Sequence, residues 1–182
     1  MQLLGIPSVT NAYIVSGANS SGNRLLASIL VRSGCRGEGN TNQPTNEHDI
    51  PESDGTHFAM IAQEHLGLWS TRFLSKGYDS IVAILIIREP VANGLSMVKR
   101  GHWKTIQQAL DSRQRIISDT IRDAESLAIE LHIVTYEGLS EPMLESWLPT
   151  IGLPYSTGPL QLRGQHGAQN WITNENAKHY QE

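Results

Sequence analysis

The chain has 182 residues, of which 39% are hydrophobic and 18% charged, and its formal net charge is −4. This length suits one globular domain with a real core, and the composition is neither that of a disordered chain nor that of a basic protein built to bind nucleic acid. The longest purely apolar run, residues 81–87, is too short to cross a membrane. We therefore predict one domain over residues 1–182, with neither a nucleic acid nor a membrane as partner.

The cysteine count and the first residues indicate a compartment. Cys35 is the only cysteine, which excludes an internal disulfide and a cysteine-based zinc site. The N-terminal sequence has neither the basic stretch nor the long apolar segment of a signal peptide. Both features predict a cytoplasmic location.

The first third of the chain predicts a strand, a helix and a long loop. Residues 12–16 are apolar and partly β-branched and precede a glycine, which is typical of a buried strand. Leucine and isoleucine recur at helical spacing over residues 25–30, and Gly34 is a suitable stop. Residues 35–55 are rich in glycine and small polar side chains. We expect a loop there, and a loop of this length in a compact domain is usually functional or disordered.

The middle and the end of the chain continue the alternation. Apolar residues over 58–69 fall on one side of a helix, and residues 81–87 are apolar on both faces, like a central parallel strand. Pro90 opens a short helix, since its missing N–H costs nothing in the first turn. The pattern then predicts a long amphipathic helix, a third strand, a short helix and a polar tail, at residues 105–128, 131–136, 143–148 and 160–182.

This order of elements predicts an α/β fold. Strands separated by helices form a parallel sheet that is covered on both faces, because each crossover carries a helix. We expect a three-layer sandwich with a central parallel sheet, like that of the P-loop nucleoside triphosphate hydrolases. Ligands of such sheets bind at the carboxyl ends of the strands. The loops after Ser16, Ile87 and Tyr136 are therefore the candidate site.

A glycine-rich turn joins the first predicted strand to the first predicted helix. Gly17 and Gly22 stand five residues apart, as the glycines do in the phosphate-binding loop GxxxxGK[ST]. Such a turn aims backbone N–H groups inward, and the helix N-terminus adds roughly half a positive charge. The pattern predicts a phosphate site, and an ordinary strand-to-helix turn is the alternative.

Two positions of this turn differ from a nucleoside triphosphatase. Asn23 stands where the lysine would be, and Arg24 stands where the serine or threonine that binds magnesium would be. Metal-assisted transfer of a γ-phosphate depends on both groups. We expect the loop to hold a phosphate but to be poorly equipped to hydrolyse ATP.

Four segments of the chain match the motifs of a known family in order and spacing. The glycine-rich turn is followed by two leucines, and the strand ending in Arg88 is followed by Glu89-Pro90 and, eight residues after the arginine, by Ser96. The other two segments are TYEGL with a later proline, and LRGQHG with a following tryptophan, at residues 135–142 and 162–176. Together they resemble the sulfotransferases that use 3′-phosphoadenosine 5′-phosphosulfate, as a small and divergent member.

The resemblance implies a donor and its binding residues. The donor is 3′-phosphoadenosine 5′-phosphosulfate, the product is adenosine 3′,5′-bisphosphate, and the transfer requires no metal. The resemblance assigns the phosphosulfate to the glycine-rich turn and the 3′-phosphate to the arginine and serine after the middle strand and to the C-terminal segment. The nucleotide-binding residues are then Gly17, Asn19, Ser20, Ser21, Gly22, Asn23, Arg24, Arg88, Ser96, Arg163 and Gly164.

Catalysis would further need a cation and a base. Family members usually carry lysine or arginine where this chain has Ser20, and Arg24 is our candidate for the missing charge. A base must accept the proton of the acceptor, a small molecule or a glycan with a hydroxyl or amine group. The long loop offers acidic side chains and two histidines, and we take His48 and His57 as the candidates.

Two other functions remain open at the level of the sequence. A nucleotide or nucleoside kinase shares the glycine-rich turn and the size but would need the missing lysine. A non-catalytic nucleotide-binding domain is favoured by Ser20, because this residue leaves the turn without its usual cation.

Overall fold

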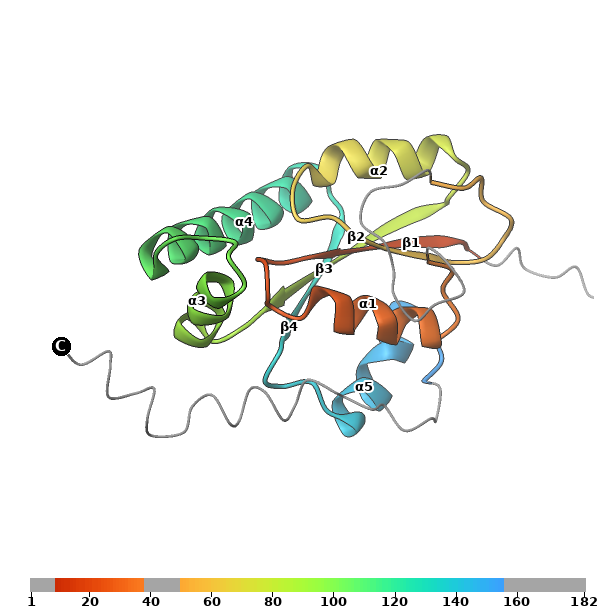
Figure 1. Cartoon of the computed structure of the whole chain (residues 1–182). Coiled ribbons are helices and arrows are strands. Elements are labelled where there is room, and N and C mark those ends of the chain that lie inside the picture. The colour runs from red at the N-terminus through yellow and green to blue at the C-terminus, as the bar shows by residue number, and fades with distance from the viewer. Residues whose placement is uncertain (1–8, 38–49, 156–182) are drawn as a thin grey trace, which may run out of the picture.

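The computed structural model describes residues 9–37 and 50–155, and it has four parallel strands with helices packed against both faces of the sheet (Figure 1). The strands lie side by side in the order β2-β1-β3-β4. This arrangement confirms the predicted α/β fold with a central parallel sheet. The elements in chain order are β1 (Asn11–Ser16), α1 (Asn23–Arg32), β2 (Phe58–Ile61), α2 (Leu66–Ser75), β3 (Ser80–Ile87), α3 (Pro90–Lys99), α4 (Ile106–Ser126), β4 (Glu130–Thr135), α5 (Glu141–Trp147) and the 3₁₀ helix η1 (Leu148–Ile151).

The register places the carboxyl ends of the strands at one edge of the sheet. Val15 of β1 lies opposite Ile61, the last residue of β2. Ser16, at the end of β1, lies opposite Leu85 of β3, and Ile87 lies opposite Thr135 at the end of β4. The loops that leave these strands therefore begin next to one another.

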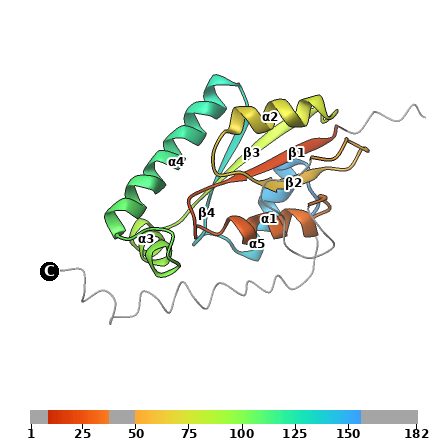
Figure 2. The same ribbon diagram turned by 45° about the horizontal axis from the view of Figure 1, so that its top comes forward.

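Side chains of the strands alternate between two helical layers. Tyr13 and Val15 belong to a core with α1 and α5, whereas Ala12 and Ile14 belong to a core with α2. Figure 2 shows α1 and α5 on one side of the sheet and α2 and α4 on the other. Because both faces are buried, β1 and β3 are apolar without alternation, which is why the sequence identifies them as strands.

The prediction of a helix over residues 58–69 is wrong in its first part. Phe58–Ile61 is the short strand β2, with all four side chains buried, and the helix α2 begins only at Leu66. A short apolar run whose two faces are both buried can have apolar residues at helical spacing by chance. In the structure Phe58 packs on Phe73, with ring centroids 5.6 Å apart.

The remaining described elements lie within a few residues of their predicted bounds. Side chains cap three of the helices: Glu89 accepts hydrogen bonds at the start of α3, Thr105 at the start of α4 and Ser140 at the start of α5. Most of the predicted long loop, residues 38–49, lies outside the described residues, as does the tail from residue 156.

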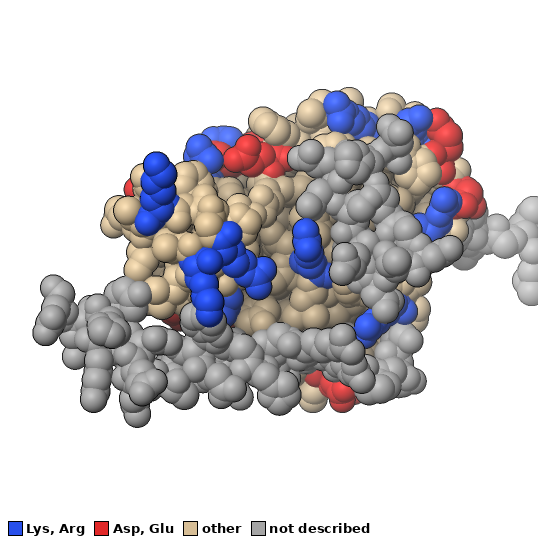
Figure 3. Space-filling view, viewed as in Figure 1, with Lys and Arg blue, Asp and Glu red and all other residues tan. Residues whose placement is uncertain are grey.

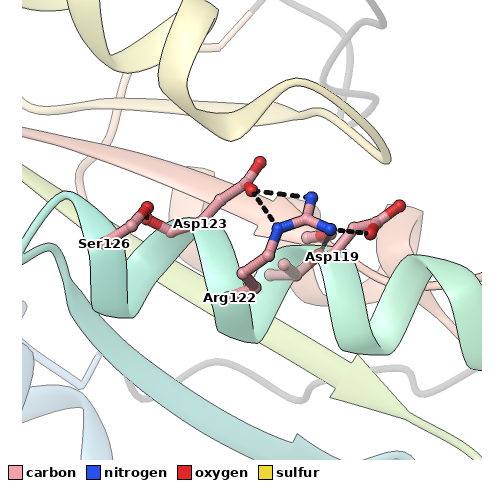
Figure 4. Close-up of polar contacts among 6 residues, drawn as sticks. Asp119, Arg122, Asp123 and Ser126 are labelled. Carbon is pink, nitrogen blue, oxygen red and sulfur yellow. Dashed lines mark hydrogen bonds and ion pairs between the residues drawn. The ribbon is translucent and has the colours of Figure 1, made fainter.

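The longest helix, α4, carries an exposed cluster of charges. Arg122 forms ion pairs with Asp119 at 2.8 Å and with Asp123 at 3.0 Å (Figure 4). Such exposed pairs contribute little to stability. In residues 9–37 and 50–155, no helix combines the length and the apolar character needed to cross a bilayer.

Candidate functional site

The glycine loop, residues 17–22, has a backbone that depends on its two glycines. Gly17, Ser20 and Gly22 have φ angles of 155°, 63° and 105°. A Cβ atom at Gly17 would strike the carbonyl oxygen of Ile86, and one at Gly22 would lie 2.5 Å from Cδ2 of Tyr136. Only a residue without a side chain fits at either position.

Two polar side chains of the loop region point inward and hold the loop closed. Nδ2 of Asn23 donates to the carbonyl oxygen of Gly17 at 2.8 Å, and Oγ of Ser21 donates to that of Ala18 at 2.5 Å. Asn23 and Ser21 are only 7% and 1% exposed. Both were predicted to bind the nucleotide, but their side chains are engaged within the loop. The backbone N–H of Ser21 is engaged as well, because it donates to the carbonyl oxygen of Ala18 at 3.2 Å, so of these two residues it is Asn23 that offers a backbone N–H to a ligand.

The N-terminus of α1 follows the loop directly. Its N-cap is Gly22, and no side chain of the described residues caps it. The N–H groups of a first helical turn have no partner inside the helix, and the helix dipole makes this end positive. Together the loop and the helix end can bind an anionic group such as a phosphate.

Three side chains from other elements hold the loop in place. Arg88, after β3, donates from Nη1 to the carbonyl oxygen of Ser20 at 3.1 Å. Asn93, in the first turn of α3, donates to the carbonyl oxygen of Asn19 at 2.8 Å, and Gln63, after β2, donates to Oδ1 of Asn19 at 2.8 Å. The carboxyl ends of β1, β2 and β3 therefore meet at the glycine loop.

The guanidinium group of Arg88 lies between this loop and an aromatic ring. Its Cζ is 4.9 Å from the centroid of the Tyr136 ring, and its buried Nε has no hydrogen-bond partner among the described residues. The acids next to it are engaged elsewhere: both carboxylate oxygens of Glu89 cap α3, and Glu137 accepts from the N–H of Glu89. Arg88 is thus a half-buried cation that has no carboxylate partner among the described residues, and such a cation favours an anionic ligand.

Arg24 and Ser96 lie near the same edge of the sheet. Arg24 is exposed in the first turn of α1, and Ser96 is half-buried in the second turn of α3. Figure 3 shows Lys and Arg side chains gathered over α3 and a further basic side chain over α1. Of the described residues predicted to bind the nucleotide, Arg88 and the glycine loop are in direct contact, and Arg24 and Ser96 lie in the two helices that begin at this edge.

His57 does not lie with these residues. It precedes β2, and its Nδ1 accepts a hydrogen bond from the N–H of Asn11 at 2.9 Å. Asn11 begins β1 and the glycine loop follows its end, so a strand of roughly 17 Å separates them. This placement separates His57 from the glycine loop and engages its Nδ1 with the first residue of β1. The other predicted base, His48, lies outside the described residues, as do Arg163 and Gly164.

The end of β2 brings residues to the site that the sequence did not single out. Gln63 contacts the glycine loop, and Glu64 and His65 follow it. His65 is exposed with a φ angle of 63°, and Glu64 forms an ion pair with Arg115 of α4 at 3.3 Å. The rule that sites lie at the carboxyl ends of parallel strands would have found them, had residues 58–61 been recognised as a strand.

Comparisons add no relative to this description. No family model matches the chain, and neither the curated proteins nor the solved structures gave a match. Within the described ranges, no group of three or more His, Cys, Asp and Glu side chains is arranged to hold a metal ion.

Proposed function

We propose that this protein binds 3′-phosphoadenosine 5′-phosphosulfate and transfers its sulfuryl group to a hydroxyl or amine of a small-molecule or glycan acceptor, on a fold of the P-loop type. The observation that carries the proposal is the contact of Arg88 with the carbonyl oxygen of Ser20. It joins a guanidinium group that has no carboxylate partner in the described part of the chain to a loop and helix end that can bind an anion. The proposed donor has two anionic groups, the phosphosulfate for the loop and helix end and the 3′-phosphate for Arg88.

The glycine loop takes the phosphosulfate in this proposal. The backbone N–H groups at the end of the loop and in the first turn of α1 are the donors, because no side chain of the described residues caps that turn. The side chain of Asn23, which stands where a kinase would have lysine, is occupied by the carbonyl oxygens of Gly17 and Ala18. The loop therefore lacks the side chain that would reach a γ-phosphate, which favours the sulfuryl donor over ATP.

In this proposal Arg88 and Ser96 bind the 3′-phosphate. A guanidinium group and a phosphate form short, charge-assisted hydrogen bonds, and an adjacent hydroxyl can donate one more. The ring of Tyr136 covers one side of the guanidinium group. Arg163 and Gly164 stay a prediction, since they lie outside the described residues.

The reaction forms a bond between the acceptor oxygen or nitrogen and sulfur. The bond between sulfur and the bridging oxygen breaks, and its electron pair leaves with adenosine 3′,5′-bisphosphate. Arg24 would stabilise the charge that develops on this leaving oxygen. The proton of the acceptor passes to a base, and the end of β2 offers His65 and Glu64 for this role because Gln63 contacts the loop.

One observation favours a domain that binds the nucleotide without turning it over. Residues 17–22 include no lysine or arginine, so the loop presents no cation of its own, and the hydroxyl of Ser20 is buried without a hydrogen-bond partner among the described residues. Catalysis would then depend on Arg24 alone. This second candidate shares the binding site and differs only in the chemical step.

Binding and turnover are measured separately to test the proposal. Calorimetry should show tighter binding of adenosine 3′,5′-bisphosphate than of ATP with magnesium, and the Arg122→Ala variant, altered in the exposed ion pairs of α4, should bind equally well. Incubation with the sulfuryl donor and a phenol should release the bisphosphate and form the sulfate ester. Tight binding without any transfer supports the non-catalytic domain, and tighter binding of ATP with magnesium supports a kinase.

A further inference from the structure

A second arginine reaches the end of β3 from the opposite helical layer. Nη2 of Arg113, on α4, donates to the carbonyl oxygen of Arg88 at 3.0 Å. The side chain of Arg88 lies on the other side of the sheet, because its neighbour Tyr136 and the preceding Ile86 belong to the core with α1 and α5. Two guanidinium groups therefore approach one strand end from opposite faces.

The charge of Arg113 has no carboxylate partner in the described part of the chain. The described arginines that do form ion pairs are Arg36, Arg115 and Arg122. Arg113 is half-buried, and its Nε is buried without a hydrogen-bond partner among the described residues. Leaving a half-buried cation unpaired is costly, and an anionic ligand would remove that cost.

A second unsatisfied group lies on α3, which packs against α4. Asn93 is completely buried, and its Nδ2 holds the carbonyl oxygen of Asn19 in the glycine loop. Its Oδ1 has no hydrogen-bond partner among the described residues. Buried polar groups nearly always have partners. Asn93 Oδ1 and Arg113 Nε are thus two buried polar atoms near the ends of β1 and β3 that lack a partner among the described residues, and a polar ligand would supply one.

We place the acceptor at the carboxyl edge of the sheet on the side of α4, because the nucleotide occupies the other side. The phosphosulfate and the 3′-phosphate occupy the glycine loop and Arg88 in the proposed function, on the side of α1. The ion pair between Arg115 and Glu64 joins α4 to the turn after β2, where the candidate bases lie. If the acceptor lies between α4 and that turn, the distance from its reacting group to Arg113 is one to two strand spacings, or roughly 5–10 Å.

We propose that Arg113 binds an anionic group of the acceptor, so that the natural acceptor is itself an acid: a carboxylate, sulfate or phosphate that also carries the hydroxyl or amine to be sulfated. This inference rests on the proposed function and adds the substrate class to it. Arg113 acts by binding and orienting the acceptor, and it takes no part in the proton transfer.

A matched pair of phenols tests the charge requirement. The acid is 3-(4-hydroxyphenyl)propionate, and the neutral control is the corresponding amide, which has nearly the same shape. The parent protein should sulfate the acid with a kcat/KM about tenfold higher or more, as expected for one charge-assisted contact. Arg113→Gln should remove this preference, Arg113→Lys should keep most of it, and Arg122→Gln, on the same helix, should not change it. All variants should bind adenosine 3′,5′-bisphosphate within about twofold of the parent.

Each outcome decides a different claim. Equal kcat/KM values for acid and amide in the parent overturn the acidic acceptor. A tenfold loss of bisphosphate affinity in Arg113→Gln moves Arg113 to the nucleotide site and also overturns it. If no variant transfers sulfate although the bisphosphate binds, the proposed chemistry fails. The acid should even then raise the Tm of the bisphosphate complex more than the amide does, in the parent but not in Arg113→Gln, and an equal shift overturns the inference about Arg113.

Discussion

The guanidinium group of Arg88 donates a hydrogen bond to the carbonyl oxygen of Ser20, although the two residues are 68 positions apart in the chain. The contact exists because β1 and β3 are neighbouring parallel strands that end at the same edge. It gives Arg88 two tasks, to support the glycine loop and to bind an anion. The two tasks can be separated by comparing Arg88 with Asn93, which supports the same loop from α3.

Arg88→Ala should weaken the binding of adenosine 3′,5′-bisphosphate by about 1.5–3 kcal/mol, because a charge-assisted contact is lost. Binding of adenosine 5′-phosphate should fall less, since that ligand loses only the support of the loop. Asn93→Ala is the control and should weaken the binding of both nucleotides equally. Calorimetry with the two nucleotides checks this, and equal losses for both ligands in Arg88→Ala would contradict the assignment of the 3′-phosphate.

Gly22→Ala should destabilise the protein more than Gly34→Ala. Both glycines have a φ angle of 105°, so both substitutions carry the same backbone strain of about 1–2 kcal/mol. A Cβ at Gly22 would lie 2.5 Å from the Tyr136 ring, whereas a Cβ at Gly34 would meet no atom of the described residues within 4 Å. The added clash should cost a further 1–3 kcal/mol or so.

Urea unfolding of the two variants measures the difference. Nucleotide binding should be reduced in Gly22→Ala and unchanged in Gly34→Ala, because only the first glycine lies in the loop. Equal free energies of unfolding would mean that the ring of Tyr136 moves aside at little cost.

His57 should make the stability of the protein depend on pH. Burial lowers the pKa of His57 below its ordinary value of 6.5. Its Nδ1 also accepts the hydrogen bond of Asn11, so protonation at this atom would break that bond. The unfolded chain therefore takes up the proton more readily. The contribution of His57 to the free energy of unfolding is fully present above pH 6.5 and is lost as the pH falls through the folded pKa.

Urea unfolding at pH 7.5 and pH 5.5 checks this sign. The parent should lose more stability than the His57→Gln variant between these two pH values. A variant with the same pH dependence as the parent would show that His57 titrates alike in the folded and the unfolded chain.

The sequence predicts the interior strands and the glycine loop but not the residues that support the loop. β1 and β3 are buried on both faces, and their apolar runs follow from that position alone. Asn93 and Gln63 act through contacts with Asn19, 74 and 44 positions away, and no local spacing marks them. The sequence does not predict a functional role for Arg113 either, because a single arginine on an amphipathic helix usually faces solvent.

The difference between the expected and the observed position of His57 has the same physical origin. Reading residues 58–62 as part of a helix hid the strand end that brings Gln63 to the loop and that Glu64 and His65 follow. It also left His57 in a long loop, whereas the structure places it at the amino edge of the sheet. For short buried strands, the spacing of hydrophobic residues alone does not distinguish a strand from a helix.

His65→Gln should lower the turnover of sulfuryl transfer and leave the affinity for adenosine 3′,5′-bisphosphate unchanged. The reason is the position of His65, three residues after Ala62, whose N–H bonds to the carbonyl oxygen of Val15 in β1. A general base typically contributes 10²–10⁴-fold, so a loss of about 100-fold is expected. His102→Gln, in the exposed turn after α3, is the matched control. Full activity of His65→Gln would leave Glu64 as the candidate at this strand end.

Arg24→Ala should lower the rate of sulfuryl transfer more than it lowers donor affinity. Arg24 is exposed in the first turn of α1, next to a loop whose Ser20 provides no charge. If Arg24 stabilises the leaving oxygen in the transition state, its loss lowers kcat with little change in binding. Arg32→Ala, in the last turn of the same helix, is the control and should change neither quantity. Single-turnover transfer to a phenol, measured beside donor binding, separates the two effects.

Placing a cation in the loop by Ser20→Arg in the Arg24→Ala protein should restore part of the rate. An Arg24→Ala protein that works at the parent rate would show that the charge comes from another residue.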